Sequence, residues 1–230
     1  MKKSHSLGPY ISSQEIIGGF CYLCFQLVLL PGLLTWANSR MGLDTAQLNF
    51  VYYLVNFIAA LLIFHEFLGS SLSQAFQHPI MLCEAVILGF VAYYACFHLT
   101  DWLVGLLVPS FSNYNDESIF AMSSGNRFLM LIGTVVLVPL AEECFFRGLI
   151  FRNLYGKSRW AAYLVSMLAF ACIHILGYIG QYSPLELVMA LLQYLPAGLC
   201  LGWSYVKADT IFAPILVHAA VNYVTINGLR

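Results

Sequence analysis

The stretch FLMLIGTVVLVPLAEECFFRGLIFRNL, residues Phe128–Leu154, decides the fold class of this chain. It is long and apolar enough to cross a bilayer as a helix, because a span takes about 20 mostly apolar residues. Near its middle it carries two adjacent carboxylates, Glu142 and Glu143, followed by Arg147. Ionised groups at this depth are costly and usually face a protein-lined or watered cavity. The stretch therefore indicates a membrane helix that also carries a candidate functional site.

The composition of the whole chain agrees with a membrane protein. Of its 230 residues, 60% are hydrophobic and 9% are charged, and the mean hydropathy is +0.79. An average soluble domain has about 25% charged residues, so these few charges could not cover a soluble surface. The net charge of -1 leaves no basic stripe to neutralise phosphates, and no nucleic-acid partner is expected. We predict an all-α, polytopic membrane helical bundle.

Several segments have the length and apolar character of membrane spans. They are Ile16–Leu34, Leu48–Phe64, Pro79–Val108, Phe128–Leu154, Trp160–Ile179, Leu185–Val206 and Ile211–Ile226. We expect about seven transmembrane helices, within a range of about six to eight. The range is open because Pro79–Val108 could be one long tilted helix or a span followed by a short interfacial piece. No repeat or second domain is visible, so residues 1–230 are predicted to form a single transmembrane domain, with Ser110–Arg127 as a loop.

The distribution of Lys and Arg predicts the orientation, because cytoplasmic loops carry an excess of both. With seven spans and a cytoplasmic N-terminus, the inner side holds Lys2, Lys3, Arg152, Lys157, Arg159 and Lys207. The outer side then holds Arg40, Arg127 and Arg230. We therefore expect a multi-pass integral membrane protein with its N-terminus in the cytoplasm.

The carboxylates of the opening stretch divide into two roles by their helical positions. Glu143 and Arg147 are spaced i, i+4, which lets them meet on one helix face as an ion pair. Glu142 points about 100° away from Glu143 and is left for chemistry. Pro139 lies one turn earlier and removes a backbone donor, which loosens a helix and opens room for water.

Two further polar pairs lie in later apolar segments. In FACIH, Phe170 and His174 are spaced i, i+4, so we expect the phenyl ring to stack beneath the imidazole. In HAAVN, His218 and Asn222 have the same spacing and project from one face. Each pair alone is explained by helix packing, since His and Asn often hydrogen-bond between membrane helices. Together with Glu142 they form an unusual polar inventory for so apolar a chain and predict a shared catalytic cavity.

This inventory suits hydrolysis of an amide by an activated water. A carboxylate can act as general base on a water whose other proton an imidazole accepts. Asn and His side chains can donate hydrogen bonds to a developing oxyanion. Cys144 and Cys172 lie two residues from Glu142 and His174 and point to the opposite sides of their helices, so no protein nucleophile is expected.

The order EECFFR, FACIH and HAAVN resembles the motifs of the CAAX protease and bacteriocin-processing family. These are intramembrane endopeptidases related to the type II CAAX prenyl protease. The resemblance covers residues 128–222, which would carry the catalytic core. It implies that Glu142 with His174 activates the attacking water and that His218 with Asn222 forms the oxyanion hole. Glu143, Arg147 and Phe170 would support the site.

The resemblance also implies that no cofactor is needed, although such proteins are often described as metalloproteases. If a metal were bound, zinc held by Glu142, His174 and His218 would be the alternative, since His and carboxylate sets are usual zinc ligands. No His pair has the H-E-x-x-H spacing that places two ligands and a base on one helix face.

The expected partners are the lipid bilayer and a membrane-associated peptide or protein as substrate. The short chain favours a bacterial member of the family, in the plasma membrane. Two alternatives remain open: a non-catalytic immunity or regulatory membrane protein of the same fold, and a small-solute transporter. The intact motifs argue against the first, and the lack of paired broken helices or of a duplicated half argues against the second.

Overall fold

The computed structural model describes residues 7–228 of the chain. Within this range all regular structure is helical apart from an isolated bridge between Ile179 and Tyr182, so the predicted all-α class is confirmed. The first part of the chain forms α1 (Ser13–Val28), α2 (Leu30–Met41), α3 (Thr45–Ile63), α4 (His65–Gln77), α5 (Pro79–Leu107) and α6 (Tyr114–Gly125). The second part forms α7 (Arg127–Ile132), η1 (Gly133–Leu137), α8 (Val138–Glu143), η2 (Cys144–Phe151), α9 (Arg152–Tyr155), α10 (Arg159–Ile175), η3 (Leu176–Tyr178), α11 (Pro184–Ala208) and α12 (Phe212–Ile226).

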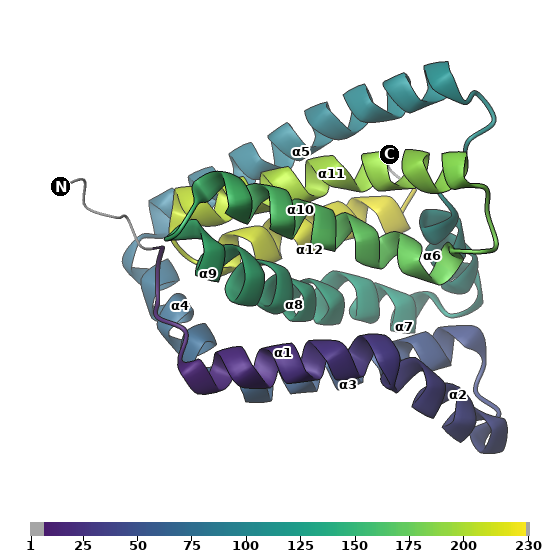
Figure 1. Cartoon of the computed structure of the whole chain (residues 1–230), viewed down its shortest axis with the longest axis horizontal. Helices are drawn as coiled ribbons and strands as arrows, with labels where there is room; N and C mark the ends of the chain where they lie inside the picture. The colour runs from purple at the N-terminus through teal and green to yellow at the C-terminus, as the bar shows by residue number, and fades with distance from the viewer. Residues whose placement is uncertain (1–6, 229–230) are drawn as a thin grey trace.

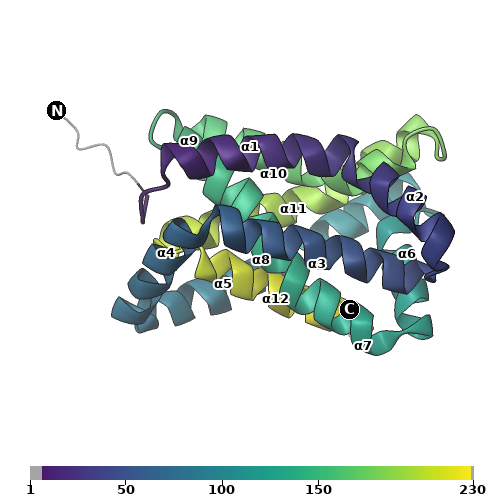
Figure 2. The ribbon, with the colours of Figure 1, turned by 90° about the horizontal axis from the view of Figure 1, so that it is seen from below.

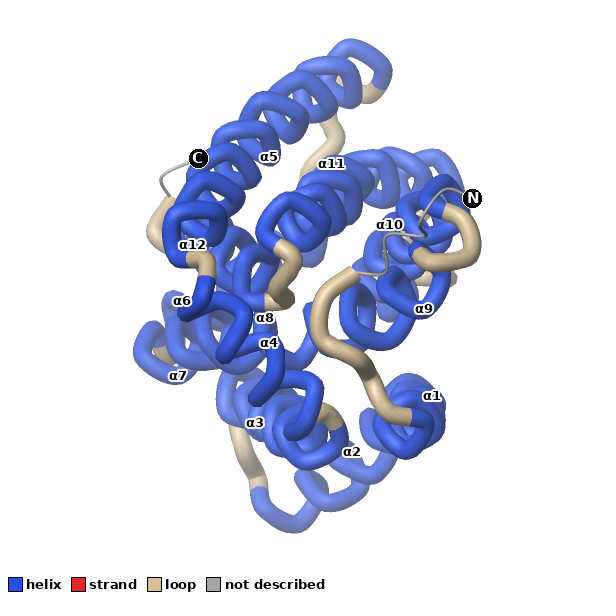
Figure 3. Tube along the Cα trace, turned by 90° about the vertical axis from the view of Figure 1, so that its left-hand side faces the viewer, coloured by secondary structure: helices blue, strands red, loops and turns tan. Residues whose placement is uncertain are grey.

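The long helices run along a common direction, with α11 inside the bundle (Figure 1). Helix α11 packs against α5, α10 and α12. Its approach to α10 is close, because a Cβ on Gly198 would lie 2.7 Å from the Cα of Met167. Small residues permit such backbone contact between membrane helices. Helices α1 and α3 lie side by side along another flank of the bundle (Figure 2), and Figure 3 looks along the helices from one end.

The span count differs from the prediction of about seven. Among the described residues, five helices are long and apolar enough to cross a membrane, or up to six if α1 and α2, bent by 51°, count as one broken span. The remaining predicted segment forms α12, which has 15 residues. At 1.5 Å per residue it reaches only about 22 Å, short of a hydrocarbon core of about 30 Å. All seven predicted segments are helical, but the last is shorter than a full span.

The region 79–108 forms one uninterrupted helix. Helix α5 has 29 residues and begins with Pro79 at its first position, where a missing N–H costs nothing. At about 44 Å it exceeds the hydrocarbon core, so it extends beyond that core or tilts within it. The alternative of a span followed by a separate interfacial piece is therefore wrong.

Two shorter helices occur where the sequence suggested no helix. Helix α6 forms within the segment expected to be a loop, and the side chain of Asn113 caps it by accepting from the N–H groups of Asn115 and Asp116. Helix α4 follows α3 and buries Phe67, Leu68, Ser71 and Ala75. Figure 1 shows α4 and α6 near opposite ends of the bundle.

Polar contacts show which basic residues share an end of the bundle. The N–H of Gly8 donates to Asp209 Oδ1 at 2.6 Å, and Arg152 Nε donates to the carbonyl of Pro9 at 2.8 Å. Lys207 pairs with Glu84 at 3.1 Å at this same end. At the other end, Arg127 donates to Asn227. Lys2, Lys3 and Arg230, which contribute to the predicted orientation, lie outside the described residues.

Two buried apolar clusters fix the helix that carries the candidate site. Phe145 belongs to one cluster, with Phe64 and Tyr205, and Phe146 belongs to the other, with Phe170. Because adjacent side chains of η2 are anchored on two different sides, this helix cannot rotate without disrupting one of the clusters.

Candidate active site

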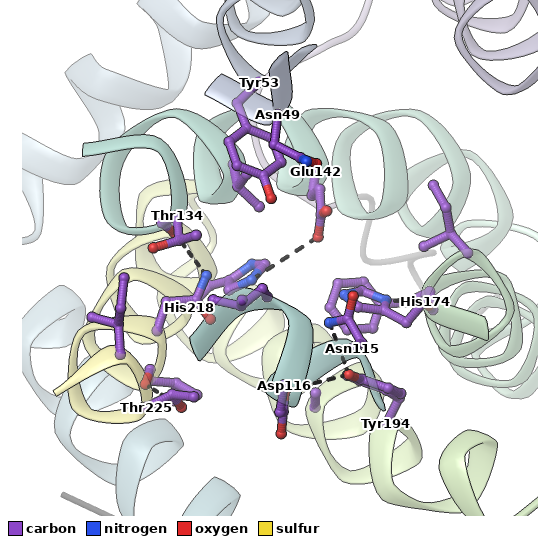
Figure 4. A pocket seen from close by; sticks show the side chains of 18 of the residues that line it. Asn49, Tyr53, Asn115, Asp116, Thr134, Glu142, His174, Tyr194, His218 and Thr225 are labelled. Carbon is purple, nitrogen blue, oxygen red and sulfur yellow. Dashed lines mark hydrogen bonds and ion pairs between the residues drawn. The ribbon is translucent and has the colours of Figure 1, made fainter. Parts of the chain in front are cut away.

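A cavity of about 490 Å³ opens between the helices that carry the three polar motifs. Its walls come from α3, α5, α6, η1, α8, α10, η3, α11 and α12. The cavity brings together the four side chains selected from the sequence as catalytic: Glu142, His174, His218 and Asn222. Figure 4 shows Glu142, His174 and His218 pointing into one space. Phe170 also lines it, whereas Glu143 and Arg147 lie behind the wall.

Glu142 presents a carboxylate oxygen to the cavity. Its side chain is 23% exposed, and its Oε2 atom lies 4.0 Å from His218 Nε2. This oxygen is buried and has no hydrogen-bond partner among the described residues. A buried carboxylate oxygen without a partner is unfavourable unless water or a ligand satisfies it. Because the side chain lines the cavity and is partly exposed, its carboxylate is placed to hold a water molecule there.

Glu143 and Arg147 form a completely buried ion pair. Arg147 Nη1 donates to Glu143 Oε1 at 3.0 Å, and both side chains are 0% exposed. Arg147 Nη2 donates to the carbonyls of Ala197 and Gly198 on α11 at 3.5 and 3.4 Å. Its guanidinium also lies over the ring of Phe170, 4.4 Å from the centroid. The pair thereby connects η2 to α10 and α11.

Glu143 has a second partner that the sequence did not reveal. His218 Nδ1 lies 2.9 Å from Glu143 Oε1, the oxygen that also accepts from Arg147. An ionised carboxylate only accepts hydrogen bonds, so Nδ1 carries the proton and donates. His218 Nε2 then faces Glu142 and the cavity. The contact joins residues 75 positions apart, which no local spacing could show.

His174 is oriented in a comparable way by a backbone carbonyl. Its Nδ1 lies 2.7 Å from the carbonyl oxygen of Phe170, which can only accept, so Nδ1 carries the proton. In the neutral ring Nε2 is then an acceptor. The phenyl ring of Phe170 lies 4.6 Å from the imidazole at 45°, tilted rather than stacked as expected. Tyr194 from α11 is the ring that stacks on His174, at 4.3 Å and 25°.

Asn222 is held by the helix that precedes Glu142. Its Nδ2 donates to the backbone carbonyl of Thr134, in η1, at 2.8 Å. One amide hydrogen is used in this bond, and the other remains for a partner in the cavity.

Helix α6 forms part of the cavity wall and is tied to α11 and to the α10–α11 connection. Asn115 donates to the hydroxyl of Tyr194 at 3.0 Å, and the ring of Tyr114 stacks on Tyr182 at 3.4 Å. Tyr114 also donates to Glu186 at 2.6 Å, and this hydrogen bond raises the pKa of Tyr114 to about 12. The phenol therefore stays a hydrogen-bond donor at neutral pH. None of these residues stood out in the sequence.

The zinc alternative can be compared with this geometry. Among the described residues, no group of three or more His, Cys, Asp or Glu side chains is arranged to hold a metal ion. Glu142, His174 and His218 share the cavity but do not converge as a ligand set. Asn222, one turn after His218, offers an amide donor toward the same space, which suits an oxyanion better than a cation.

The fold and the site define a polytopic helical membrane protein whose helices enclose a cavity lined by a carboxylate, two imidazoles and an amide. Residues 124–224 match the family described as Rce1-like, type II CAAX prenyl endopeptidase Rce1-like. The resemblance seen in the three motifs is thereby confirmed, because the family model matches the segment that carries all three of them.

Three relatives are similar to parts of this chain. The UPF0177 protein YxdF of Lactococcus lactis subsp. lactis (strain IL1403) is 33% identical over 87 residues, which cover 38% of this chain and 42% of the relative. A protein of Escherichia coli described as an uncharacterized 24.3 kDa protein is 29% identical over 93 residues, 39% of each chain. The UPF0177 protein YbdI of the same Lactococcus strain is 25% identical over 140 residues, 59% of this chain and 71% of the relative.

The chain thus spans about two fifths of the length of YxdF and of the Escherichia coli protein. No solved structure matches it.

Proposed function

We propose that this protein is an intramembrane endopeptidase that cleaves a membrane-associated peptide or protein with a water activated by Glu142 and His174. The observation that carries the proposal is that the carboxylate side chain of Glu142, which is 23% exposed, and the imidazole of His174 line one cavity, with His174 Nδ1 held by the Phe170 carbonyl so that Nε2 is an acceptor. A water that donates one hydrogen to each acceptor directs its lone pair away from both. That lone pair is then available to attack a carbonyl carbon.

The remaining polar groups suit the charge that develops during the attack. As the water oxygen bonds to the carbonyl carbon, Glu142 takes the water proton and the carbonyl oxygen becomes an oxyanion. Asn222 donates to it with the Nδ2 hydrogen not used by Thr134. His218 donates through Nε2, which requires the imidazolium form because Nδ1 already donates to Glu143. The C–N bond then breaks, and the proton on Glu142 passes to the leaving amine.

The charge of the cavity favours an internal peptide bond over one next to a free carboxyl terminus. Its described lining includes the carboxylates of Asp116 and Glu142 and no lysine or arginine. A substrate carboxylate brought close to these groups would be repelled, because charges interact strongly at low dielectric. A lysine or arginine is the usual permanent cation for a terminal carboxylate, and none lines this cavity among the described residues, while the imidazolium of His218 is used by the oxyanion. We therefore propose endopeptidase rather than carboxypeptidase activity.

The proposal is tested with purified protein in proteoliposomes and a defined library of short synthetic peptides. Reactions run in oxygen-18 water and analysed by mass spectrometry should show internal cleavage with one heavy oxygen in each new carboxyl group. Glu142→Gln protein, prepared identically, is the control and should cleave nothing. Equal cleavage by both preparations would assign the activity to a contaminant and contradict the proposal.

We also propose that the N-terminus lies in the cytoplasm of a bacterial cell, with Arg152, Lys157, Arg159 and Lys207 at the cytoplasmic end. The contacts that join Gly8, Pro9, Arg152 and Lys207 at one end of the bundle support this grouping. Helix α6, which contributes Asn115, Asp116 and Ile119 to the cavity lining, lies toward the opposite end (Figure 1). On this orientation α6 and the residues that it contributes to the cavity lie toward the outer side of the membrane.

A further inference from the structure

The amide of Asn222 is held by a carbonyl that has lost both of its usual backbone donors. Asn222 Nδ2 donates to the oxygen of Thr134 at 2.8 Å. In an α-helix that oxygen would accept from the N–H four residues later, on Val138, and in a π-helix from the N–H five residues later, at position 139.

Neither donor is present. The N–H of Val138 donates instead to the carbonyl of Gly133, which is the π-type bond of η1. Position 139 is a proline, which has no N–H. Thr134 is only 4% exposed, and a buried carbonyl needs a hydrogen-bond partner. The side chain of Asn222, from the neighbouring helix α12, supplies that partner.

We infer that Pro139 is a positioning residue for Asn222: by denying Thr134 a backbone donor, it leaves a carbonyl that the Asn222 amide satisfies. Pro139 is buried and does not line the cavity, so it acts without touching the substrate. With one Nδ2 hydrogen fixed on Thr134, the rotation of the amide is set. The catalytic consequence of this arrangement rests on the proposed function, whereas the arrangement itself does not.

A substitution that restores the missing N–H tests the inference. In Pro139→Ala the new N–H competes with Asn222 for the Thr134 carbonyl, and the amide is released. Loss of a single oxyanion donor costs about 10²- to 10³-fold in kcat, so a misplaced donor should cost about tenfold or more. We expect kcat to fall by that factor while KM changes by less than about twofold, because the contact acts on the transition state.

Two matched variants separate positioning from a general effect on folding. Pro214→Ala, in the first turn of the helix that carries Asn222, changes a proline where the helix needs no N–H donor and should leave kcat unchanged. In an Asn222→Ala background, Pro139→Ala should cause no further loss of kcat, because the group it positions is absent. A full additional loss in that background would show a purely structural role and overturn the inference.

A readout that does not depend on activity completes the test. With ¹⁵N-asparagine labelling, the side-chain amide signal that disappears in Asn222→Ala is assigned to Asn222. This signal should move in Pro139→Ala and not in Pro214→Ala. Pro139→Gly supplies the same N–H and serves if the alanine variant does not fold. An unchanged signal in a folded Pro139 variant overturns the inference. A shifted signal in Pro139→Ala, combined with a wild-type protein that cleaves no peptide, supports the inference and refutes the proposed function.

Discussion

Glu143 Oε1 accepts two hydrogen bonds at once, from Arg147 Nη1 at 3.0 Å and from His218 Nδ1 at 2.9 Å. The carboxylate therefore connects a structural ion pair to a residue of the cavity. Glu142, its neighbour in sequence, approaches the same imidazole from the other side, with 4.0 Å between its Oε2 and His218 Nε2. The two adjacent carboxylates thus lie next to opposite nitrogens of one ring: Glu143 hydrogen-bonds Nδ1, and Glu142 faces Nε2. Each carboxylate therefore has a separate role.

Removing Arg147 should destabilise the protein. In Arg147→Ala the Glu143 carboxylate, 0% exposed, stays buried with His218 as its remaining partner. Leaving a buried charge without its counter-ion costs about 3–5 kcal/mol. We expect a lower thermal unfolding temperature in detergent and less protein in the membrane. Lys207→Ala is the matched control, because its pair with Glu84 is 37% and 53% exposed and should contribute about 0–1 kcal/mol. Equal effects of both substitutions would contradict the structural role of the buried pair.

Replacing both members of that pair should separate stability from activity. In Glu143→Leu combined with Arg147→Met neither charge of the pair remains, and apolar replacements of buried ion pairs are often neutral for stability. The double variant should therefore unfold at a higher temperature than Arg147→Ala. Its peptide cleavage should stay low, because His218 Nδ1 has lost its acceptor. Wild-type activity in the stable double variant would show that the contact between Glu143 and His218 does not matter for catalysis.

Glu142→Gln should abolish activity without affecting the fold. The substitution keeps the size and hydrogen bonding of the side chain and removes the base, and a general base contributes about 10²- to 10⁴-fold to the rate. The unfolding temperature should change little, because the side chain is 23% exposed and its Oε2 has no hydrogen-bond partner among the described residues. Glu66→Gln, at a carboxylate that is 68% exposed, controls for loss of negative charge. Turnover retained in Glu142→Gln but lost in Glu143→Gln would reverse the two roles.

Local spacing was sufficient to predict much of the candidate site. The i, i+4 rule paired Glu143 with Arg147 and placed Glu142 on another face, and the structure shows this ion pair and this separation. Apolar segment length likewise located the helices. These features follow from one helix at a time, which is why a single sequence contains them.

Features that depend on contacts between helices could not be predicted in the same way. The bond from His218 to Glu143 and the stack of Tyr194 on His174 arise only when distant segments pack together. Helix α6 was missed because its sequence, YNDESIFAMSSG, has no clear apolar stripe, and its start depends on the Asn113 cap. Pro139 was correctly expected to disturb its helix, but its effect on Asn222 required the structure.

The predicted orientation is tested by cysteine labelling of intact cells, in a background without native cysteines. Glu117→Cys, on the exposed side of α6, should react with a membrane-impermeant maleimide added outside. Lys157→Cys, in the turn between α9 and α10, should react only after the membrane is permeabilised. These expectations follow from the excess of Lys and Arg at the end that carries Arg152 and Lys207. The opposite labelling pattern would place α6 and its end of the bundle on the cytoplasmic side.

The last prediction concerns metal, because two chemistries would use the same cavity residues. A zinc enzyme would need Glu142, His174 and His218 to converge on one ion, and an open position for water. In the structure, His174 and His218 each donate from Nδ1 to a fixed acceptor, an arrangement that would suit zinc ligands as well as a water-activating pair. The amide of Asn222 distinguishes them, since its anchor on Thr134 leaves an N–H donor for the cavity, and a donor stabilises an oxyanion and not a cation.

We therefore expect purified protein stripped with a strong chelator to keep cleaving its peptides, and elemental analysis to find no stoichiometric zinc. A zinc-dependent protease treated in parallel should lose its activity, which shows that the chelator works. Asn222→Ala should lower kcat about 10²-fold whether or not zinc is added, because its loss removes a donor and not a ligand. Cleavage abolished by the chelator and restored by zinc alone would overturn the metal-free mechanism, while leaving the location of the site unchanged.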